Sequence, residues 1–306
     1  MLRQAIAKAH GFTVSQIFPR ASLSQLMTTV AAAFWGPEDH IALGEPCRPA
    51  FTRSVLRVGA RYVDIGRDQQ WTLQRGALER LLTDGQLRAL VLGRPAMPTG
   101  TVASLELVTR ALASGVLVVV DETDLAYSDP GAGLPRAVSP NSDTALTLVQ
   151  DSGVDTRGLI VLRRVPGLGT AQLVYAVADP ETIARLWRLD PDGSIPAPVA
   201  AGAWIALDHT AHARRIITEQ CAVRSALAAA IADISGYSVA SSSGPAVCVG
   251  RPGVSGEALR VALGAGGLVV AHSPHHSWRD HVAFGLPTDT VIARVVSAFE
   301  HASQAL

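Results

Sequence analysis

The sequence of 306 residues is short of lysine and carries no excess of either charge. Lys8 is the only lysine, and every other basic residue is an arginine. Any reaction that needs a lysine amine must therefore use Lys8. Basic and acidic residues number 26 each, so the net charge is zero. This balance gives no electrostatic footprint for nucleic acid or for an anionic membrane, and neither partner is expected.

Cysteine and long apolar runs are also scarce. Cys47, Cys221 and Cys248 lie too far apart for a disulfide framework or a metal-ligand pattern, so ordinary thiols are expected. The longest apolar run, around Val116–Val120, falls well below the roughly 20 residues of a membrane-spanning helix. The opening segment, MLRQAIAKAHGF, has an amphipathic helical pattern and lacks the features of a signal peptide. We therefore expect a cytoplasmic protein.

Apolar residues make up 48% of the chain, enough for a substantial core. Short β-rich runs alternate with helical patterns, which predicts an α/β fold: a large domain whose mostly parallel sheet is flanked by helices. The expected strands are His40–Leu43, Ala60–Ile65, Arg88–Leu92, Val116–Val120, Ala145–Val149, Leu159–Leu162 and Gln172–Ala178. The expected helices are Ser24–Phe34, Ala50–Val58, Arg75–Thr83, Val102–Ala113 and Glu181–Leu189.

The segment Pro191–Pro198 is rich in proline and is interpreted as a hinge between domains. It divides the chain into a large domain, residues 1–190, and a smaller C-terminal α+β domain, residues 191–306. The smaller domain is expected to contain a helical stretch Ala200–Ser235 with a break near Asp208, strands Ala246–Val249 and Leu268–Ala271, and helices Glu257–Leu263 and Thr288–Ala302.

Several motifs follow one another in a fixed order along the chain. They are Leu2-Arg3-Gln4-Ala5-Ile6 with His10-Gly11, Phe34–Asp39, Gly44-Glu45-Pro46, Arg94–Gly100, Val118–Glu122, Val161-Leu162-Arg163 and Tyr175–Glu181. Together they resemble histidinol-phosphate aminotransferase and its relatives, including threonine-phosphate decarboxylases, within the fold-type I class I/II aminotransferases. The resemblance implies a three-layer pyridoxal phosphate (PLP) transferase fold. The family also has a substrate-covering arm before this start; either the gene model is short or the arm has been lost.

The resemblance implies a PLP site and gives four residues roles in it. Asp121 takes the place of the carboxylate on the pyridine nitrogen, and Phe51 that of an aromatic residue stacked on the ring. Ser22 and Ser24 fall in the turn that cradles the phosphate. Each has a structural alternative as well: a carboxylate at a strand end, a core aromatic residue and a helix cap. The end of a buried parallel strand, where Asp121 stands, also suits a binding site.

The lysine that would hold PLP as a Schiff base aligns with Gly167, so no catalytic residue is assigned. Pro166 replaces a phosphate-binding serine, Met97 an asparagine and Asp124 a tyrosine of the family pattern. Covalent binding of PLP is therefore not expected. Lys8 belongs to the opening helix, and nothing in the pattern directs it toward Asp121.

Near the C-terminus, the resemblance aligns His281 with an arginine that binds the substrate carboxylate. Arg279 precedes it by two residues and would share its face of a strand, although an ordinary surface arginine is the alternative. His272, His275, His276 and His281 lack a zinc-site spacing, and no metal is expected.

The leading functional hypothesis is a catalytically degenerate pseudoenzyme with an aminotransferase fold, which acts as a binding or partner subunit. Because fold-type I enzymes build their active sites at a dimer interface, the resemblance implies a homodimer or a heterodimer with an aminotransferase-like subunit. Two alternatives stay open. The first is a PLP-dependent aminotransferase or amino-acid decarboxylase of the histidinol-phosphate aminotransferase type. The second is an enzyme that binds PLP or pyridoxamine phosphate (PMP) noncovalently. The sequence names neither the physiological ligand nor the partner.

Overall fold

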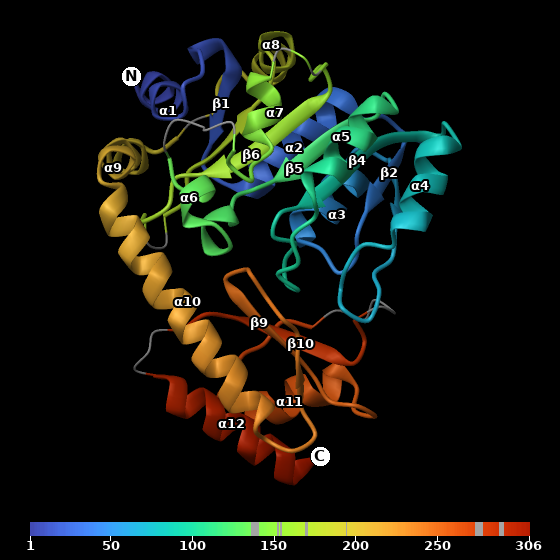
Figure 1. The fold of residues 1–306 in the computed structure, drawn as a ribbon, viewed down its shortest axis with the longest axis vertical. Coiled ribbons are helices and arrows are strands. Elements are labelled where there is room, and N and C mark those ends of the chain that lie inside the picture. Colours follow the sequence, from blue (N-terminus) through green and yellow to red (C-terminus); the bar gives the residue numbers. More distant parts are fainter. Residues whose placement is uncertain are drawn as a thin grey trace.

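A seven-stranded sheet organises the first part of the chain in the computed structural model (Figure 1). The structure describes residues 1–135, 141–151, 153, 155–168, 171–193, 195–272, 278–287 and 291–306. The strand order is β1-β7-β6-β5-β4-β2-β3. These strands are β1 (Ile17–Arg20), β2 (His40–Leu43), β3 (Arg61–Asp64), β4 (Leu87–Gly93), β5 (Leu117–Asp121), β6 (Leu159–Arg164) and β7 (Val174–Val177).

Strands β2 to β6 run parallel, and β7 pairs antiparallel with both β6 and β1. The expected mostly parallel sheet is confirmed. Since side chains alternate along a strand, β5 places Val118 and Val120 on one face and Leu117 and Val119 on the other. Each face therefore needs its own layer of helices.

One face packs under α1 (Leu2–His10), α4 (Arg75–Thr83), α5 (Leu105–Ala113), α7 (Leu146–Gln150) and α9 (Ala197–Asp208). The other packs under α2 (Leu23–Phe34), α3 (Pro49–Arg57) and α8 (Pro180–Leu189). Short segments η1 (Val14–Gln16), η2 (Leu125–Tyr127) and α6 (Pro130–Gly133) complete this part. The three layers position the loops at the carboxyl ends of the strands.

A second, antiparallel sheet of three strands lies in the C-terminal part, in the order β10-β9-β8. The strands are β8 (Ser238–Val239), β9 (Ala246–Gly250) and β10 (His281–Gly285), with α11 (Gly256–Ala265) and α12 (Ile292–Ala305). Their core is centred on the fully buried Phe299, whose ring meets Tyr237 edge-on.

Helix α10 (Thr210–Ala232) connects the two parts of the molecule, as Figure 1 shows. Its first turns pack Ala213 and Ile217 against Tyr127 in the larger part, while Leu227 belongs to the smaller core. The break expected near Asp208 is confirmed, because α9 ends there and α10 begins two residues later. Helix α9 itself packs on α1 and the larger core. The domain limits at 190/191 stay a prediction.

Two of the expected strands are wrong. Residues 146–149 belong to helix α7 and Ala145 directly precedes it; Ala145 donates its N–H to Glu122, and Leu146 donates its N–H to the Thr144 hydroxyl, so both groups are satisfied without a strand partner. A short apolar run does not distinguish a strand from a buried helix. Of Leu268–Ala271, only Ala271 pairs, in an isolated bridge with Ala283.

Strands β1 and β8 were not expected, and β10 was anticipated only as the strand on which Arg279 and His281 were expected to lie. Strand β1 is only four residues long and contains Pro19, which is tolerated because β1 lies at the sheet edge. The other expected helices and strands in the described residues are confirmed, with ends that differ by a few residues. The start of the expected helix at Thr288 lies outside the described residues. Among those that are described, no helix combines the length and apolarity that crossing a membrane requires.

Candidate functional site

Asp121 ends the central strand β5 and is almost fully buried. Its Oδ1 accepts a hydrogen bond of 2.9 Å from Thr123 N. Its Oδ2 lies 3.0 Å from Nε of Arg48, the residue that directly precedes α3. The aspartate was expected at this strand end, and its arginine partner was not.

Arg48 and Asp121 form an ion pair without a well-aligned hydrogen bond between Nε and Oδ2. Both atoms are buried, and 3.0 Å separates them. Burial raises the pKa of Asp121, and the positive charge of Arg48 opposes that rise. Burial also lowers the pKa of Arg48, but the two carboxylates facing it more than offset this and leave the pKa raised. Both groups therefore depend on each other for their charged forms.

Asp124 extends this pair into a cluster of four charges. Its Oδ2 pairs with Arg48, and its Oδ1 lies 2.9 Å from Arg164 Nη2. The Arg164 guanidinium also lies over the Tyr127 ring, 5.6 Å from its centroid. We call Arg48, Asp121, Asp124 and Arg164 the charge cluster. Its two positive and two negative groups alternate, so the cluster is neutral without any ligand.

Gly167, at the position of the expected lysine, has a φ of 84°. A Cβ atom at this position would lie 3.4 Å from Cβ of Ala213 on α10. The positive φ is what suits this position to glycine, since the distance to Ala213 is an ordinary van der Waals contact. Lys8 is exposed on α1, which covers one face of the larger sheet.

The serines of the expected phosphate turn differ in their surroundings. Ser22 caps α2, since its hydroxyl accepts from Gln25 N at 3.2 Å. Ser24 is exposed. The nearby Arg20 is fully buried and its Nε lies 2.9 Å from Asp190 Oδ2. The helix-cap alternative for Ser22 is therefore observed.

Phe51 lies on α3 and is buried in the core between α2, α3 and the sheet. It also lines a cavity together with Met97. Arg279 precedes β10 in a turn, and 74% of its side chain is exposed. The expectation that Arg279 and His281 share one strand face is wrong, because the strand begins only at His281. His281 packs against Trp71, with the ring centroids 4.9 Å apart.

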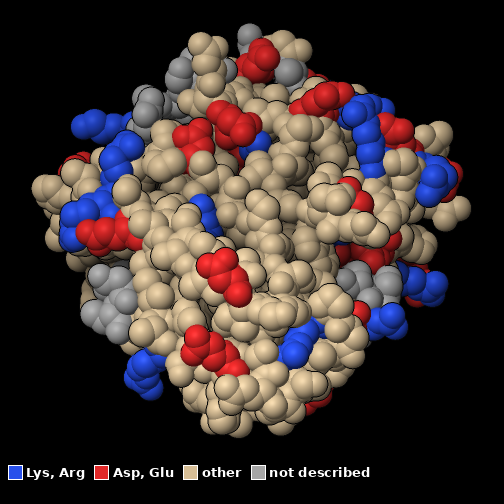
Figure 2. Space-filling model, turned by 60° about the horizontal axis from the view of Figure 1, so that its bottom comes forward, with Lys and Arg blue, Asp and Glu red and all other residues tan. Residues whose placement is uncertain are grey.

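His275 and His276 lie outside the described residues. Within the described ranges, no group of three or more histidine, cysteine, aspartate or glutamate side chains is arranged to hold a metal ion. On the face of the molecule in Figure 2, acidic and basic side chains are interspersed among wide uncharged areas.

A second buried ionic network was missed by sequence reasoning. Glu122, next to Asp121, is held by two arginines: Arg94 Nη1 lies 2.7 Å from its Oε1, and Arg163 Nη1 3.1 Å from its Oε2. All three are fully buried. Arg94 follows β4 and Arg163 belongs to β6, so the network joins three neighbouring strands. The sequence feature that could have indicated this network is an arginine at or next to the carboxyl end of each strand that flanks β5.

The sequence of residues 1–163 matches the family model of aminotransferase class I and II. The chain belongs to this family. A histidinol-phosphate aminotransferase of Gloeobacter violaceus is 26% identical over 97% of this chain and 80% of its own length. One from Roseobacter denitrificans is 28% identical over 73% of this chain. That match spans 59% of the Roseobacter protein, so this chain covers little more than half of it.

The fold comparison agrees with the family. The crystal structure of histidinol-phosphate aminotransferase from Sinorhizobium meliloti, in complex with pyridoxal-5′-phosphate, superposes with a TM-score of 0.85. It is 16% identical and covers all of this chain and 81% of its own. At this identity the likeness shows the fold alone. The expected aminotransferase resemblance and α/β fold are confirmed. The relatives' names favour the aminotransferase alternative over the partner-subunit hypothesis.

The expectation that PLP is not held covalently stays a prediction, because the position of the Schiff-base lysine comes from the resemblance. The carboxylate for a pyridine nitrogen is present as Asp121, but Arg48 already faces it. Position 167 supplies no amine, and Met97 has no strong hydrogen-bond donor. The site is therefore a class I/II aminotransferase framework in which the chain's own arginine supplies the positive charge beside the buried carboxylate.

Proposed function

We propose that this aminotransferase-fold protein does not transaminate and acts as a binding or partner subunit. The observation that carries the proposal is the contact of Arg48 with Asp121, combined with glycine at position 167. Family chemistry requires an amine that forms an imine with PLP. This chain has glycine where the resemblance expects that amine, and Arg48 already faces its buried carboxylate.

A partner surface is supported by helix α9. Trp204 and Ile205 are 56% and 54% exposed, although large apolar side chains usually bury against something. Up to Asp208 the helix carries no charged residue. We infer that this face packs against a second copy of the chain or an aminotransferase-like subunit. A cytoplasmic location stays a prediction from the sequence.

The second candidate is an enzyme of the histidinol-phosphate aminotransferase type that binds PLP or PMP noncovalently. Two observations favour it: the relatives carry that name, and Asp121 keeps its place at the end of β5. For this function, Arg48 would have to move away from Asp121 when the ligand binds.

One titration separates these functions. Purified protein is mixed with PLP, its absorption spectrum is recorded, and the mixture is treated with borohydride. We expect no aldimine band that borohydride removes and no saturable binding. Saturable binding without such a band would favour the noncovalent enzyme instead. A stoichiometric reducible band that disappears in Lys8→Arg would show that the one lysine forms the imine and would refute the proposal. A band that persists in Lys8→Arg comes from the N-terminal amine and leaves the proposal standing.

A further inference from the structure

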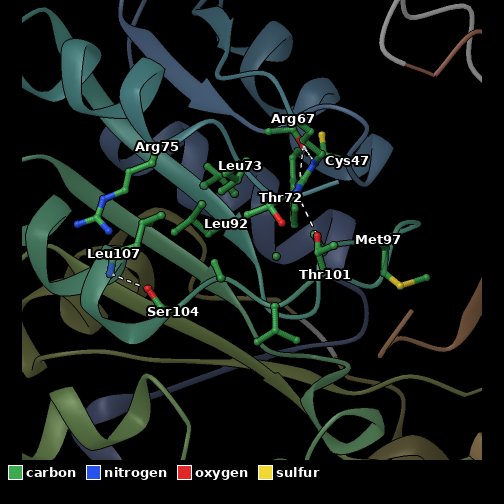
Figure 3. Close-up of a pocket in the computed structure, with 17 residues that line it drawn as sticks. Cys47, Arg67, Thr72, Leu73, Arg75, Leu92, Met97, Thr101, Ser104 and Leu107 are labelled. Atoms are coloured by element: carbon green, nitrogen blue, oxygen red, sulfur yellow. Dashed lines mark hydrogen bonds between the residues drawn. The ribbon is translucent and has the colours of Figure 1, made fainter. Parts of the chain in front are cut away.

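A cavity of about 290 Å³ lies at the carboxyl ends of β2 and β4, apart from Asp121 (Figure 3). The sheet order reverses at this point: β2 leads through α3 to β3, while β4 leads through α5 to β5 on the other side. Helices α3 and α5 cover opposite faces of the sheet. Because the chain leaves the two strands in opposite directions, a crevice opens between them, and ligands of open α/β sheets bind in such crevices.

Two glycines keep the cavity in its present shape. Gly44 directly follows β2, and a Cβ atom there would clash with Leu73 and Arg67, which both line the cavity. Gly93 ends β4, and a Cβ atom there would lie 2.7 Å from Cα of Ala96. The backbone of Ala96 requires glycine at position 93, whereas a side chain at position 44 would have to displace the ends of Leu73 and Arg67 and so would change the cavity.

Most of the cavity wall is apolar. Figure 3 shows Leu73, Leu92 and Leu107 pointing toward the same space from three different segments. Phe51, Met97 and Ala103 add further apolar surface. A ligand here would therefore be held mainly by burial of its apolar body.

Arg67 is the cation at one end of the cavity. Its Nε and Nη2 donate to Gly44 O at 3.3 and 3.0 Å, and its Nη1 donates to Trp71 O and Thr101 Oγ1 at 2.8 and 3.2 Å. All these acceptors are neutral. Since an arginine has five N–H donors, one hydrogen on Nη2 is left over. Burial lowers the pKa of Arg67, as expected for a cation without a contacting anion.

The surrounding carboxylates do not take up this last donor. Glu45, Asp64 and Asp68 act on Arg67 from beyond ion-pair distance. Each accepts hydrogen bonds from backbone N–H groups: Glu45 from Cys47, Asp64 from Glu45 and Gly66, and Asp68 from Gln70 and Thr72. Arg75, which also lines the cavity, is exposed and already pairs with two glutamates. Arg67 is thus the cation available to a ligand among the described lining residues.

We propose that this cavity binds a small monocarboxylate with an apolar body, the carboxylate on Arg67 and the body between Leu73, Leu92 and Leu107. Thr72 stands beside Arg67 in the cavity and adds a hydroxyl donor (Figure 3). One free guanidinium hydrogen and apolar walls suit a carboxylate and not a phosphate dianion, which needs several donors. Phe51 and Met97 of the expected cofactor site also line this cavity, but the inference uses neither Asp121 nor position 167, so it does not depend on the proposed function.

Isothermal titration calorimetry of the purified full chain tests this site with phenylacetate, 4-methylpentanoate and phenylacetamide. Both carboxylates should bind saturably. The neutral amide should bind about tenfold more weakly or worse, since its carbonyl oxygen can accept from Arg67 but carries no negative charge to pair with the guanidinium. Equal binding of the amide, or no saturable binding of either carboxylate, overturns the proposal. Inorganic phosphate serves as the anion control and should not compete.

Three variants locate the site. Arg67→Gln should weaken phenylacetate binding about tenfold or more, while Arg75→Gln, the matched arginine at the same cavity, should change it less than about twofold. Ala103→Leu fills the cavity while keeping Arg67, so it should abolish binding. If Arg67→Gln does not fold, Ala103→Leu still decides. Undiminished binding in a folded Ala103→Leu protein, or an equal loss in Arg75→Gln, refutes the assignment.

Discussion

Nε of Arg48 lies 3.0 Å from Oδ2 of Asp121, across a distance of 73 positions in the sequence. The aspartate is fixed by the end of a buried strand, and the arginine by the turn that starts α3. Asp124 and Arg164 extend the contact into the neutral charge cluster. The polar centre of the fold is thereby stabilised by the protein's own side chains.

Replacement of Arg48 should show how much its ion pair with Asp121 contributes to the free energy of unfolding. Arg48→Met leaves a buried carboxylate without its cation, and should lower the free energy of unfolding by about 3 kcal/mol, the lower end for a buried pair. The lower end applies because 26% of the Arg48 side chain is exposed. Urea unfolding followed by circular dichroism measures this. The double variant Arg48→Met, Asp121→Asn should regain part of the loss; a loss that simply adds up would mean that the pair is not coupled.

Restoration of a lysine should not restore transamination. Gly167→Lys places a side chain at a φ of 84°, which costs about 1–2 kcal/mol, and brings it against Ala213. Gly167→Ala is the matched control, because it carries the same backbone cost without the amine. Both variants should unfold at similar, lower urea concentrations, and neither should convert an amino acid with PLP. Measurable transamination by Gly167→Lys would show that the cofactor site is intact.

The network around Glu122 should be among the most sensitive points of the structure. Glu122→Gln removes the charge shared by Arg94 and Arg163, so we expect a loss of about 3–5 kcal/mol in unfolding free energy. Glu79→Gln is the control, since Glu79 pairs with Arg75 and Arg110 on the exposed surface and should contribute under about 1 kcal/mol. If the two variants lost similar amounts of unfolding free energy, the buried ion pairs of Glu122 would contribute no more than the exposed pairs of Glu79.

His281 should make the stability depend on pH. Burial lowers its pKa from the usual value of 6.5, against a weaker opposing effect of Asp280. With a depressed folded-state pKa, the neutral form is favoured by folding, so this contribution is present above 6.5 and is lost as the pH falls through the folded value. The unfolding free energy of wild type minus that of His281→Gln should therefore decrease on acidification below about pH 6.5. A difference that grows toward acid pH would reverse the assignment.

The sequence predicted the parts of the fold that burial patterns encode. Val116–Val120 is apolar throughout, because β5 is covered on both faces, and this placed Asp121 at a strand end. The same reasoning failed at Ala145–Val149, where Glu122 and Thr144 accept the N–H groups of Ala145 and Leu146 at the start of helix α7. Arg48 and Arg94 could not be assigned, because periodicity reports which residues are buried and not which distant charges meet.

Helix α10 contributes side chains to both cores: Ala213 and Ile217 meet Tyr127 in the larger part, and Leu227 lies in the smaller. Melting either core would strip the packing from one end of a continuous hydrogen-bonded helix, and helix formation is cooperative along its length. Heating should therefore produce one calorimetric transition, with equal van't Hoff and calorimetric enthalpies, where two loosely joined domains would give two.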